Sequence, residues 1–254
     1  MELHYQTEGD GPPLIILHGL FGSLENWQTI RKRLAHKFQV LAVDQRNHGH
    51  SPHSPFISYP LMAEDLFEFM RSHSLGQAHV LGHSMGGKTA MQFALNFPER
   101  VARLIVVDIA PRAYPPEHRP LLDALLALDL GAFKSRQQLE QALAPAVPDQ
   151  SVRRFLLKNV FRKDSGAFHW RMNLRALAHQ YAQLTEALSS TSSFAHPTLF
   201  VCGENSDYVR PEDLPQIHHF FPQATVRRVT GASHWVHADA PAPFLREVET
   251  FLER

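Results

Sequence analysis

The sequence is poor in cysteine, in net charge and in long hydrophobic runs. Its 254 residues contain a single cysteine, Cys202, so no internal disulfide can form and a reducing compartment is expected. Lysine plus arginine and aspartate plus glutamate each number 25, so the formal net charge is zero. This balance provides no overall attraction for nucleic acid or an anionic membrane, and we expect neither as a partner.

No apolar stretch has the length of a membrane span, and the first residues carry neither the basic nor the apolar region of a signal peptide. With the lone cysteine, these absences predict a cytoplasmic protein. We expect a monomer or a homodimer. Histidine is abundant, but the close pairs His48 with His50 and His218 with His219 have no recognised ligand spacing. We expect no metal.

Short apolar runs alternate with segments in which apolar residues have helical spacing. Such runs occur at residues 14–17, 38–43, 78–81, 104–107, 197–202 and 225–229. Continuous apolar runs are typical of parallel strands buried on both faces. The chain length suits one large domain with or without an insertion. The pattern therefore predicts an α/β fold with a mostly parallel central sheet flanked by helices.

The alternation stops between residues 112 and 195. This segment has no strongly apolar strand-like run, and its helix-like stretches fall at residues 119–130, 136–143, 151–161 and 174–188. We expect a helical cap inserted after the strand that ends near Asp108. The core then consists of residues 1–111 and 196–254.

Residues 80–88 contain the pattern Gly-x-Ser-x-Gly, with Gly82, Ser84 and Gly86 at its fixed positions. A predicted strand precedes the pattern and a predicted helix follows it, which is the context of a nucleophile elbow. Glycine at both flanking positions removes the Cβ atoms that so tight a turn would force together. Ser84 is therefore the candidate nucleophile.

A serine hydroxyl needs a positioned base before it can attack a carbonyl. His234 lies in the pattern Gly-x-x-His after the last predicted strand, where this architecture places the base. His237 is the alternative, but it falls at the start of the closing helical region. We favour His234.

The carboxylate that orients this histidine has two candidates. Its commonest position follows the strand at 197–202 as Gly-x-x-Asp, but Ser206 occupies that slot and Asp207 comes one residue late. A one-residue shift points an extended side chain to the opposite face. Asp108 ends the strand expected beside the nucleophile strand and can reach the same histidine. This argument favours Asp108 and leaves Asp207 as the alternative.

Two backbone N–H groups are expected to form the oxyanion hole. One belongs to Met85, directly after the nucleophile, and the other to Leu20, with Phe21 as the alternative for the second. His18 is expected to hydrogen-bond the loop backbone instead of taking part in the chemistry.

These motifs, taken together, resemble the α/β-hydrolase superfamily over essentially the whole chain. Within it, the sequence resembles the YbfF-type esterases at residues 44–51, 82–88, 107–111, 205–209 and 231–238. The resemblance implies a triad of Ser84, Asp108 and His234. It also implies hydrolysis of small-molecule acyl esters and acyl-CoA thioesters through an acyl-enzyme, with no cofactor.

Two alternatives remain open. The first is another reaction on the same triad, such as carbon–carbon bond hydrolysis or perhydrolysis. The second is a non-catalytic binding protein of the same fold, which usually lacks the serine or the histidine that are both present here. Dehalogenase and epoxide hydrolase chemistry is disfavoured because it uses an aspartate at the elbow.

The cap is expected to act as a lid that shapes the acyl pocket. Its candidate lining residues are Phe133, Phe155, Phe161, Phe168 and Trp170. Arg154, Lys158 and Arg162 are spaced by four residues and predict a basic stripe on one helix, which is either a solvated face or a site for an anion such as a coenzyme A phosphate. The solvated face is favoured.

Overall fold

The computed structural model describes residues 1–164 and 166–254. Its central sheet has seven strands in the order β1-β3-β2-β4-β5-β8-β9. β1 pairs antiparallel with β3, and the other neighbours in this sheet pair in parallel. The strands are β1 (Tyr5–Glu8), β2 (Pro13–Leu17), β3 (Gln39–Val43), β4 (Ala78–His83), β5 (Val101–Val107), β8 (Thr198–Gly203) and β9 (Ala224–Val229). The predicted α/β fold is confirmed.

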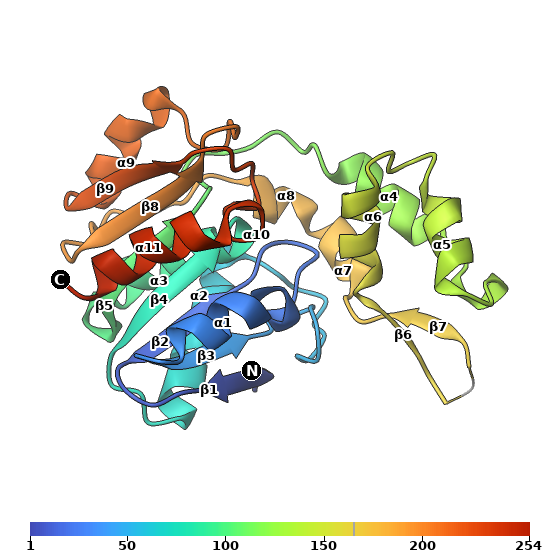
Figure 1. Cartoon of the computed structure of the whole chain (residues 1–254), viewed down its shortest axis with the longest axis horizontal. Helices are drawn as coiled ribbons and strands as arrows, with labels where there is room; N and C mark the ends of the chain where they lie inside the picture. The colour runs from blue at the N-terminus through green and yellow to red at the C-terminus, as the bar shows by residue number, and fades with distance from the viewer. Residues whose placement is uncertain (165) are drawn as a thin grey trace.

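Helices cover both faces of the sheet (Figure 1). One face carries α1 (Gln28–Leu34) and α11 (Pro241–Leu252), which contact each other, and the other carries α2 (Tyr59–Ser72) and α3 (Met85–Asn96). The shorter core elements are η1 (Leu24–Trp27), η2 (Pro98–Arg100), η4 (Pro211–Asp213), α9 (Leu214–Phe220) and α10 (Val236–Asp239).

β2 illustrates why these apolar runs become central strands. Leu14 and Ile16 belong to the hydrophobic cluster under α1 and α11, whereas Ile15 and Leu17 belong to the cluster under α2 and α3. All four side chains are buried, because successive residues of a strand point to opposite faces. A strand covered on both sides therefore needs an unbroken apolar run.

The chain between β5 and β8 forms a separate mass beside the sheet, here called the cap segment (residues 112–195; Figure 1). Its elements are α4 (Arg119–Ala127), η3 (Leu130–Ala132), α5 (Arg136–Leu143), α6 (Gln150–Leu157), β6 (Val160–Arg162), β7 (Phe168–Trp170), α7 (Leu174–His179) and α8 (Tyr181–Thr185). Among the described residues, no helix is long and apolar enough to cross a membrane.

Two details of the cap segment differ from the sequence prediction. The helix predicted at 151–161 ends at Leu157, because residues 160–162 pair with residues 168–170 in an antiparallel hairpin. The helix predicted at 174–188 is divided at Gln180, which ends α7 and precedes α8. In both places the apolar spacing continues through the break, so periodicity alone does not reveal it.

Candidate active site

Ser84 lies at the turn between β4 and α3, in a backbone conformation that few side chains adopt. Its φ is 53° and its ψ is −117°, in the region that favours glycine. The Ser84 N–H donates to the Val107 carbonyl at 3.0 Å, and the Ser84 carbonyl accepts the Lys88 N–H at 3.0 Å. The turn leaves the Ser84 side chain half-buried, although both of its chain neighbours are buried.

The two flanking glycines make this turn sterically feasible. A Cβ on Gly82 would lie 2.1 Å from the Gly86 carbonyl oxygen, and a Cβ on Gly86 would lie 2.4 Å from the Leu17 carbonyl oxygen. Both neighbours are backbone atoms that cannot move aside as a flexible side chain could. The helix N-terminus can therefore approach the ends of β2 and β4 only with glycine at these positions.

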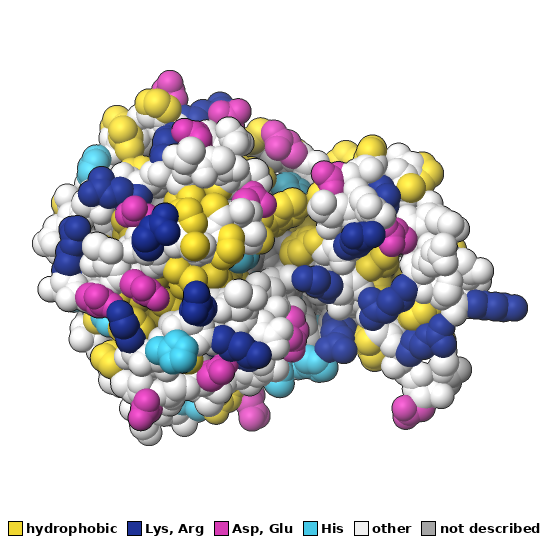
Figure 2. Space-filling view, in the orientation of Figure 1, with side chains coloured by type: hydrophobic (Ala, Val, Ile, Leu, Met, Phe, Trp, Pro, Cys, Tyr) yellow, Lys and Arg dark blue, Asp and Glu magenta, His cyan; other side chains and the backbone are white. Residues whose placement is uncertain are grey.

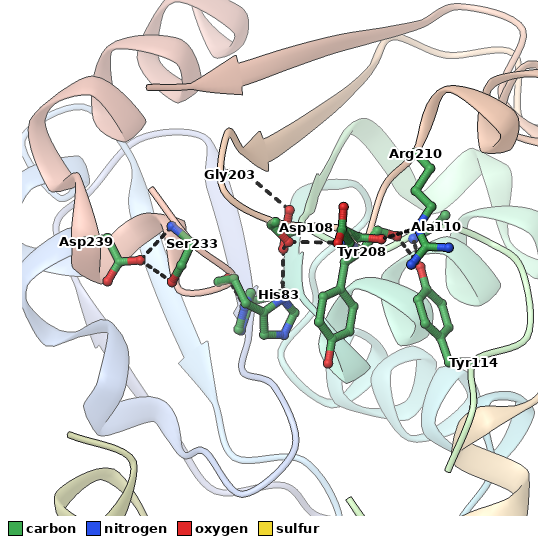
Figure 3. Close-up of polar contacts among 12 residues, drawn as sticks. His83, Asp108, Ala110, Tyr114, Gly203, Tyr208, Arg210, Ser233 and Asp239 are labelled. Carbon is green, nitrogen blue, oxygen red and sulfur yellow. Dashed lines mark hydrogen bonds and ion pairs between the residues drawn. The ribbon is translucent and has the colours of Figure 1, made fainter. Parts of the chain in front are cut away.

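Asp108 lies at the end of β5 and hydrogen-bonds the His234 ring. The distance from His234 Nδ1 to Asp108 Oδ2 is 2.8 Å. The carboxylate is fully buried and accepts two further hydrogen bonds, from the Gly203 N–H at 3.0 Å and from the Ser206 hydroxyl (Figure 3). These donors satisfy the buried carboxylate and fix the oxygen that faces the imidazole.

The two candidate acids occupy different environments. Ser206, in the slot where the commonest pattern has aspartate, points its hydroxyl at Asp108. Asp207 is exposed, and its backbone carbonyl accepts a hydrogen bond from Arg210 Nε at 3.1 Å. Of the two carboxylates, Asp108 is therefore the one that the fold brings to His234.

The two candidate bases also make different contacts. The His237 ring is buried and stacks on Trp27, with ring centroids 4.1 Å apart and planes at 11°. Burial lowers the pKa of His237 to about 3. A neutral, stacked ring of this kind is a packing element, whereas His234 is half-buried at the site and bonded to Asp108.

Two residues that the sequence analysis missed hold His234 in place. The Tyr208 ring stacks on the His234 ring, with centroids 3.8 Å apart and planes at 20°. His83 Nε2 donates a hydrogen bond to the His234 carbonyl at 2.9 Å. The signal for both was their position inside motifs already singled out, one beside the nucleophile and one just after Asp207.

Ser84 and His234 line the same cavity, which has a volume of about 450 Å³. In the part of the chain that the structure describes, no hydrogen bond joins the Ser84 hydroxyl to the His234 ring. Such bonds are often long without substrate and tighten in the complex. The arrangement therefore places an oriented imidazole and the Ser84 hydroxyl in one cavity at the same edge of the sheet.

The cavity lies between the core and the cap segment, where the surface is hollowed (Figure 2). Phe21 and Trp27 line it from the core, and His118, Leu121 and Phe155 line it from the cap segment. A second cavity of about 60 Å³ also reaches Ser84 and extends toward Lys88 on α3. Ser84 thus lines both a large cavity and a small one.

The prediction of the lining aromatic residues is mostly wrong. Within residues 1–164 and 166–254, Phe155 is the only one of the five candidates that lines the 450 Å³ cavity. Phe161, Phe168 and Trp170 belong to the β6–β7 hairpin, and Phe133 follows η3. For the three hairpin residues, the reason is that the hairpin replaces the last turn of the predicted helix.

The predicted basic stripe is also corrected, since its residues do not share one helix. Arg154 lies in α6, Lys158 caps its end, and Arg162 lies in β6. All three side chains are exposed, and the Arg162 guanidinium lies 4.5 Å from the centroid of the Phe168 ring. They form part of a solvated surface of the cap segment, on which lysine and arginine are frequent (Figure 2).

His18 fixes the loop that carries Leu20. Its Nδ1 donates to the Gly19 carbonyl at 2.8 Å, and its Nε2 accepts the Gln45 N–H at 3.0 Å. Burial lowers the pKa of His18 to about 4, so the ring is neutral near neutral pH. Leu20 lines both cavities beside Ser84, and Met85 begins α3, where the first N–H groups lack partners within the helix.

Buried neutral histidines make the folded state sensitive to acid. Burial lowers the pKa of His18 to about 4 and the pKa values of His48 and His237 to about 3. The unfolded chain binds these protons near pH 6.5, so it binds more protons than the folded chain between pH 6.5 and about 4. As the pH is lowered through this range, the free energy of unfolding is therefore expected to decrease by up to about 1.4 kcal/mol per pH unit for each such histidine.

Urea unfolding at pH 7.5, 6.0 and 5.0 measures this loss. Replacing His237 by phenylalanine keeps a ring against Trp27 and is expected to make the slope of stability against pH shallower. Replacing the exposed His36 by glutamine is the matched control and is expected to leave the slope unchanged. Stability that is constant from pH 7.5 to 5.0 would contradict the expectation.

The family model of the alpha/beta hydrolase fold matches residues 12–241. The chain therefore belongs to the α/β-hydrolase family. The match covers the strands from β2 to β9, the elbow, the cap segment and the loop of His234, which are the features described above.

Individual relatives agree with this assignment. The sn-1-specific diacylglycerol lipase ABHD11 of Danio rerio is 37% identical over 98% of this chain and 81% of that protein. Esterase YbfF of Escherichia coli is 34% identical over 97% of this chain and 95% of its own length. A solved structure titled marine microorganism esterase is 40% identical, with a TM-score of 0.97 over 98% of this chain and 99% of that one. The resemblance to YbfF-type esterases is confirmed, and these relatives support a hydrolase.

Proposed function

We propose that this protein is a serine esterase that hydrolyses acyl esters and acyl thioesters through an acyl-enzyme. The observation that carries the proposal is the Asp108–His234 hydrogen bond at the rim of the cavity that also contains Ser84. Relatives named esterase and lipase agree with it.

In the proposed reaction, Ser84 Oγ adds to the acyl carbonyl carbon while its proton passes to His234 Nε2. Asp108 keeps the other ring nitrogen protonated and stabilises the imidazolium that forms. The Leu20 and Met85 N–H groups donate to the oxyanion, and the positive end of the α3 dipole favours the same charge. Collapse expels the alcohol or thiol, which takes the proton from His234, and a water molecule repeats the sequence on the acyl-enzyme.

The cap segment serves in this proposal as the lid of the site, on a core of residues 1–111 and 196–254. Its side chains Leu121, Phe155 and Leu156 provide an apolar wall of the large cavity. Such a wall suits a hydrocarbon chain, because transfer of apolar surface out of water is favourable. We therefore assign the longer apolar arm of the ester to the large cavity.

Labelling with a fluorophosphonate, combined with a substrate panel, tests the proposal. One equivalent of probe is expected to attach, and peptide mass spectrometry is expected to locate it on Ser84. The labelled protein should lose its activity toward p-nitrophenyl esters and acyl-CoA thioesters together. The Ser189→Ala variant, which alters an exposed serine of the cap segment, is the matched control and should label fully.

Two outcomes would contradict the proposal. A protein that resists the probe and hydrolyses no ester in the panel would favour the non-catalytic binding protein. Labelling at Ser84 without ester hydrolysis, but with turnover of a carbon–carbon substrate or of peroxide, would favour another reaction on the same triad.

A further inference from the structure

The cap segment joins the core through two chain segments that run side by side. The Leu188 N–H donates to the Pro111 carbonyl at 2.8 Å, and the Tyr114 N–H donates to the Thr185 carbonyl at 2.8 Å. Residues 111–114 and 185–188, here called the cap stem, are thus the outgoing and returning connections of the cap segment. Any rigid-body movement of the cap segment relative to the core must therefore change the conformation of this stem.

Lys88 extends from α3 into the cap stem. Its side chain is 1% exposed, and Nζ donates to the Arg112 carbonyl at 2.8 Å and to the Glu186 carbonyl. One acceptor belongs to the outgoing connection and the other to the returning one. A single buried amine therefore binds both connections at once.

Aromatic rings as well as carbonyls surround the Lys88 amine. The Tyr59 and Tyr114 ring centroids lie 5.4 Å and 5.0 Å from Nζ, within the range of a cation–π contact. The Tyr59 hydroxyl also donates to the Leu184 carbonyl at 2.7 Å, beside the cap stem. Burying an amine costs free energy unless its donors are satisfied, and here carbonyls and aromatic faces satisfy them.

The ester chemistry proposed above does not use Lys88, although the residue is one helical turn from Ser84. Its backbone N–H donates to the Ser84 carbonyl at 3.0 Å, and its side chain lines the 60 Å³ cavity. Tyr59, Tyr114 and Leu184 line the same cavity. The group that anchors the cap stem is therefore also part of the wall beside the nucleophile.

We propose that Lys88 is a positioning residue that ties both connections of the cap segment to the nucleophile helix and thereby fixes the shape of the small cavity beside Ser84. The tie acts on the cap stem whether or not the protein hydrolyses esters. Its effect on substrate selection rests on the proposed function, because the small cavity is then the compartment for the shorter arm of the ester.

Hydrogen exchange and kinetics of Lys88→Met test the proposal. Methionine has similar length but donates no hydrogen bond. Because methionine removes both hydrogen bonds from Nζ, losing the tie is expected to speed amide exchange in the cap stem about tenfold. Exchange in β4 is expected to stay unchanged. On esters, KM is expected to rise by about tenfold while kcat for the acetyl ester stays within about threefold.

The matched control is Lys158→Met, an exposed lysine of the cap segment that should change neither exchange nor KM. Lys88→Arg, which retains ionic donors, is expected to restore slow exchange and low KM. It also carries the test if Lys88→Met does not fold, because fast exchange in a folded Lys88→Arg would then overturn the proposal.

Exchange separates this proposal from the proposed function. Unchanged exchange of the cap stem in folded Lys88→Met overturns the tie, whatever the activity. Fast exchange in a protein that hydrolyses no ester supports the tie and counts against the esterase instead.

Discussion

Replacing Ser84 by alanine is expected to lower kcat for ester hydrolysis by about five to six orders of magnitude, the scale on which serine triads fail without their nucleophile. Alanine has no oxygen to add to the carbonyl, so no acyl-enzyme can form. Water positioned by His234 and the oxyanion hole would leave a residual rate above the uncatalysed one. Discontinuous assays over several hours with a p-nitrophenyl ester measure this residual rate.

The fold is expected to tolerate this substitution. Serine and alanine both carry a Cβ, so the positive φ of 53° strains them alike. The hydrogen bonds that hold the turn come from backbone groups of residue 84 and do not depend on the hydroxyl. An unchanged melting temperature confirms that activity, and not structure, was lost. A rate near that of the Ser189→Ala control would show that Ser84 is not the nucleophile.

The sheet could be predicted from the sequence because central strands must be apolar on both faces. The run predicted at 14–17 is β2 (Pro13–Leu17), and the run at 38–43 is β3 (Gln39–Val43). β1 (Tyr5–Glu8) was missed, because it lies at the sheet edge and its side chains are exposed or half-buried. Such a strand needs no apolar run, and its Tyr-Gln-Thr-Glu sequence has none.

The interior of the cap segment could not be predicted in the same detail. Its helices are short, and apolar residues near a break serve the helix pattern and the hairpin equally well. Val160 and Phe168, both buried, belong to the same hydrophobic cluster but come from opposite strands of the hairpin. Which aromatic ring reaches the cavity then depends on how the hairpin and α6 are oriented, and periodicity carries no information on that.

The candidate site was predictable where a residue's place in the chain fixes its place in the fold. Ser84 and His234 each follow a strand of the parallel sheet, so both are found at the same edge. The choice between Asp108 and Asp207 depends on contacts across loops, which spacing only suggests. Lys88 was part of a recognised motif, yet its two carbonyl partners come from the outgoing and the returning connection of the cap segment.

Replacing Asp108 by asparagine is expected to lower kcat by about four orders of magnitude, as the equivalent change does in the well-known serine protease triad. The physical reason is the tautomer of His234. The Gly203 N–H would hold the amide oxygen of asparagine, because it donates to Asp108 Oδ1 in the present structure. The amide NH₂ would then face His234 Nδ1 and donate to it, which places the imidazole proton on Nε2. In this tautomer of the neutral imidazole, Nε2 already carries a proton and cannot accept the proton of Ser84.

Three variants make this prediction discriminating. Asp207→Asn alters the exposed alternative acid and is expected to keep kcat within about twofold, since a solvated carboxylate exerts little effect on a distant ring. Ser206→Ala removes one donor to the Asp108 carboxylate, and the loss of one such hydrogen bond is expected to cost about tenfold in kcat. Asp108→Asn should keep the fold, because the side chain retains its volume and a partner at Gly203. Steady-state kinetics with one ester compare all three, and a severe loss in Asp207→Asn beside a mild one in Asp108→Asn would transfer the role of acid to Asp207.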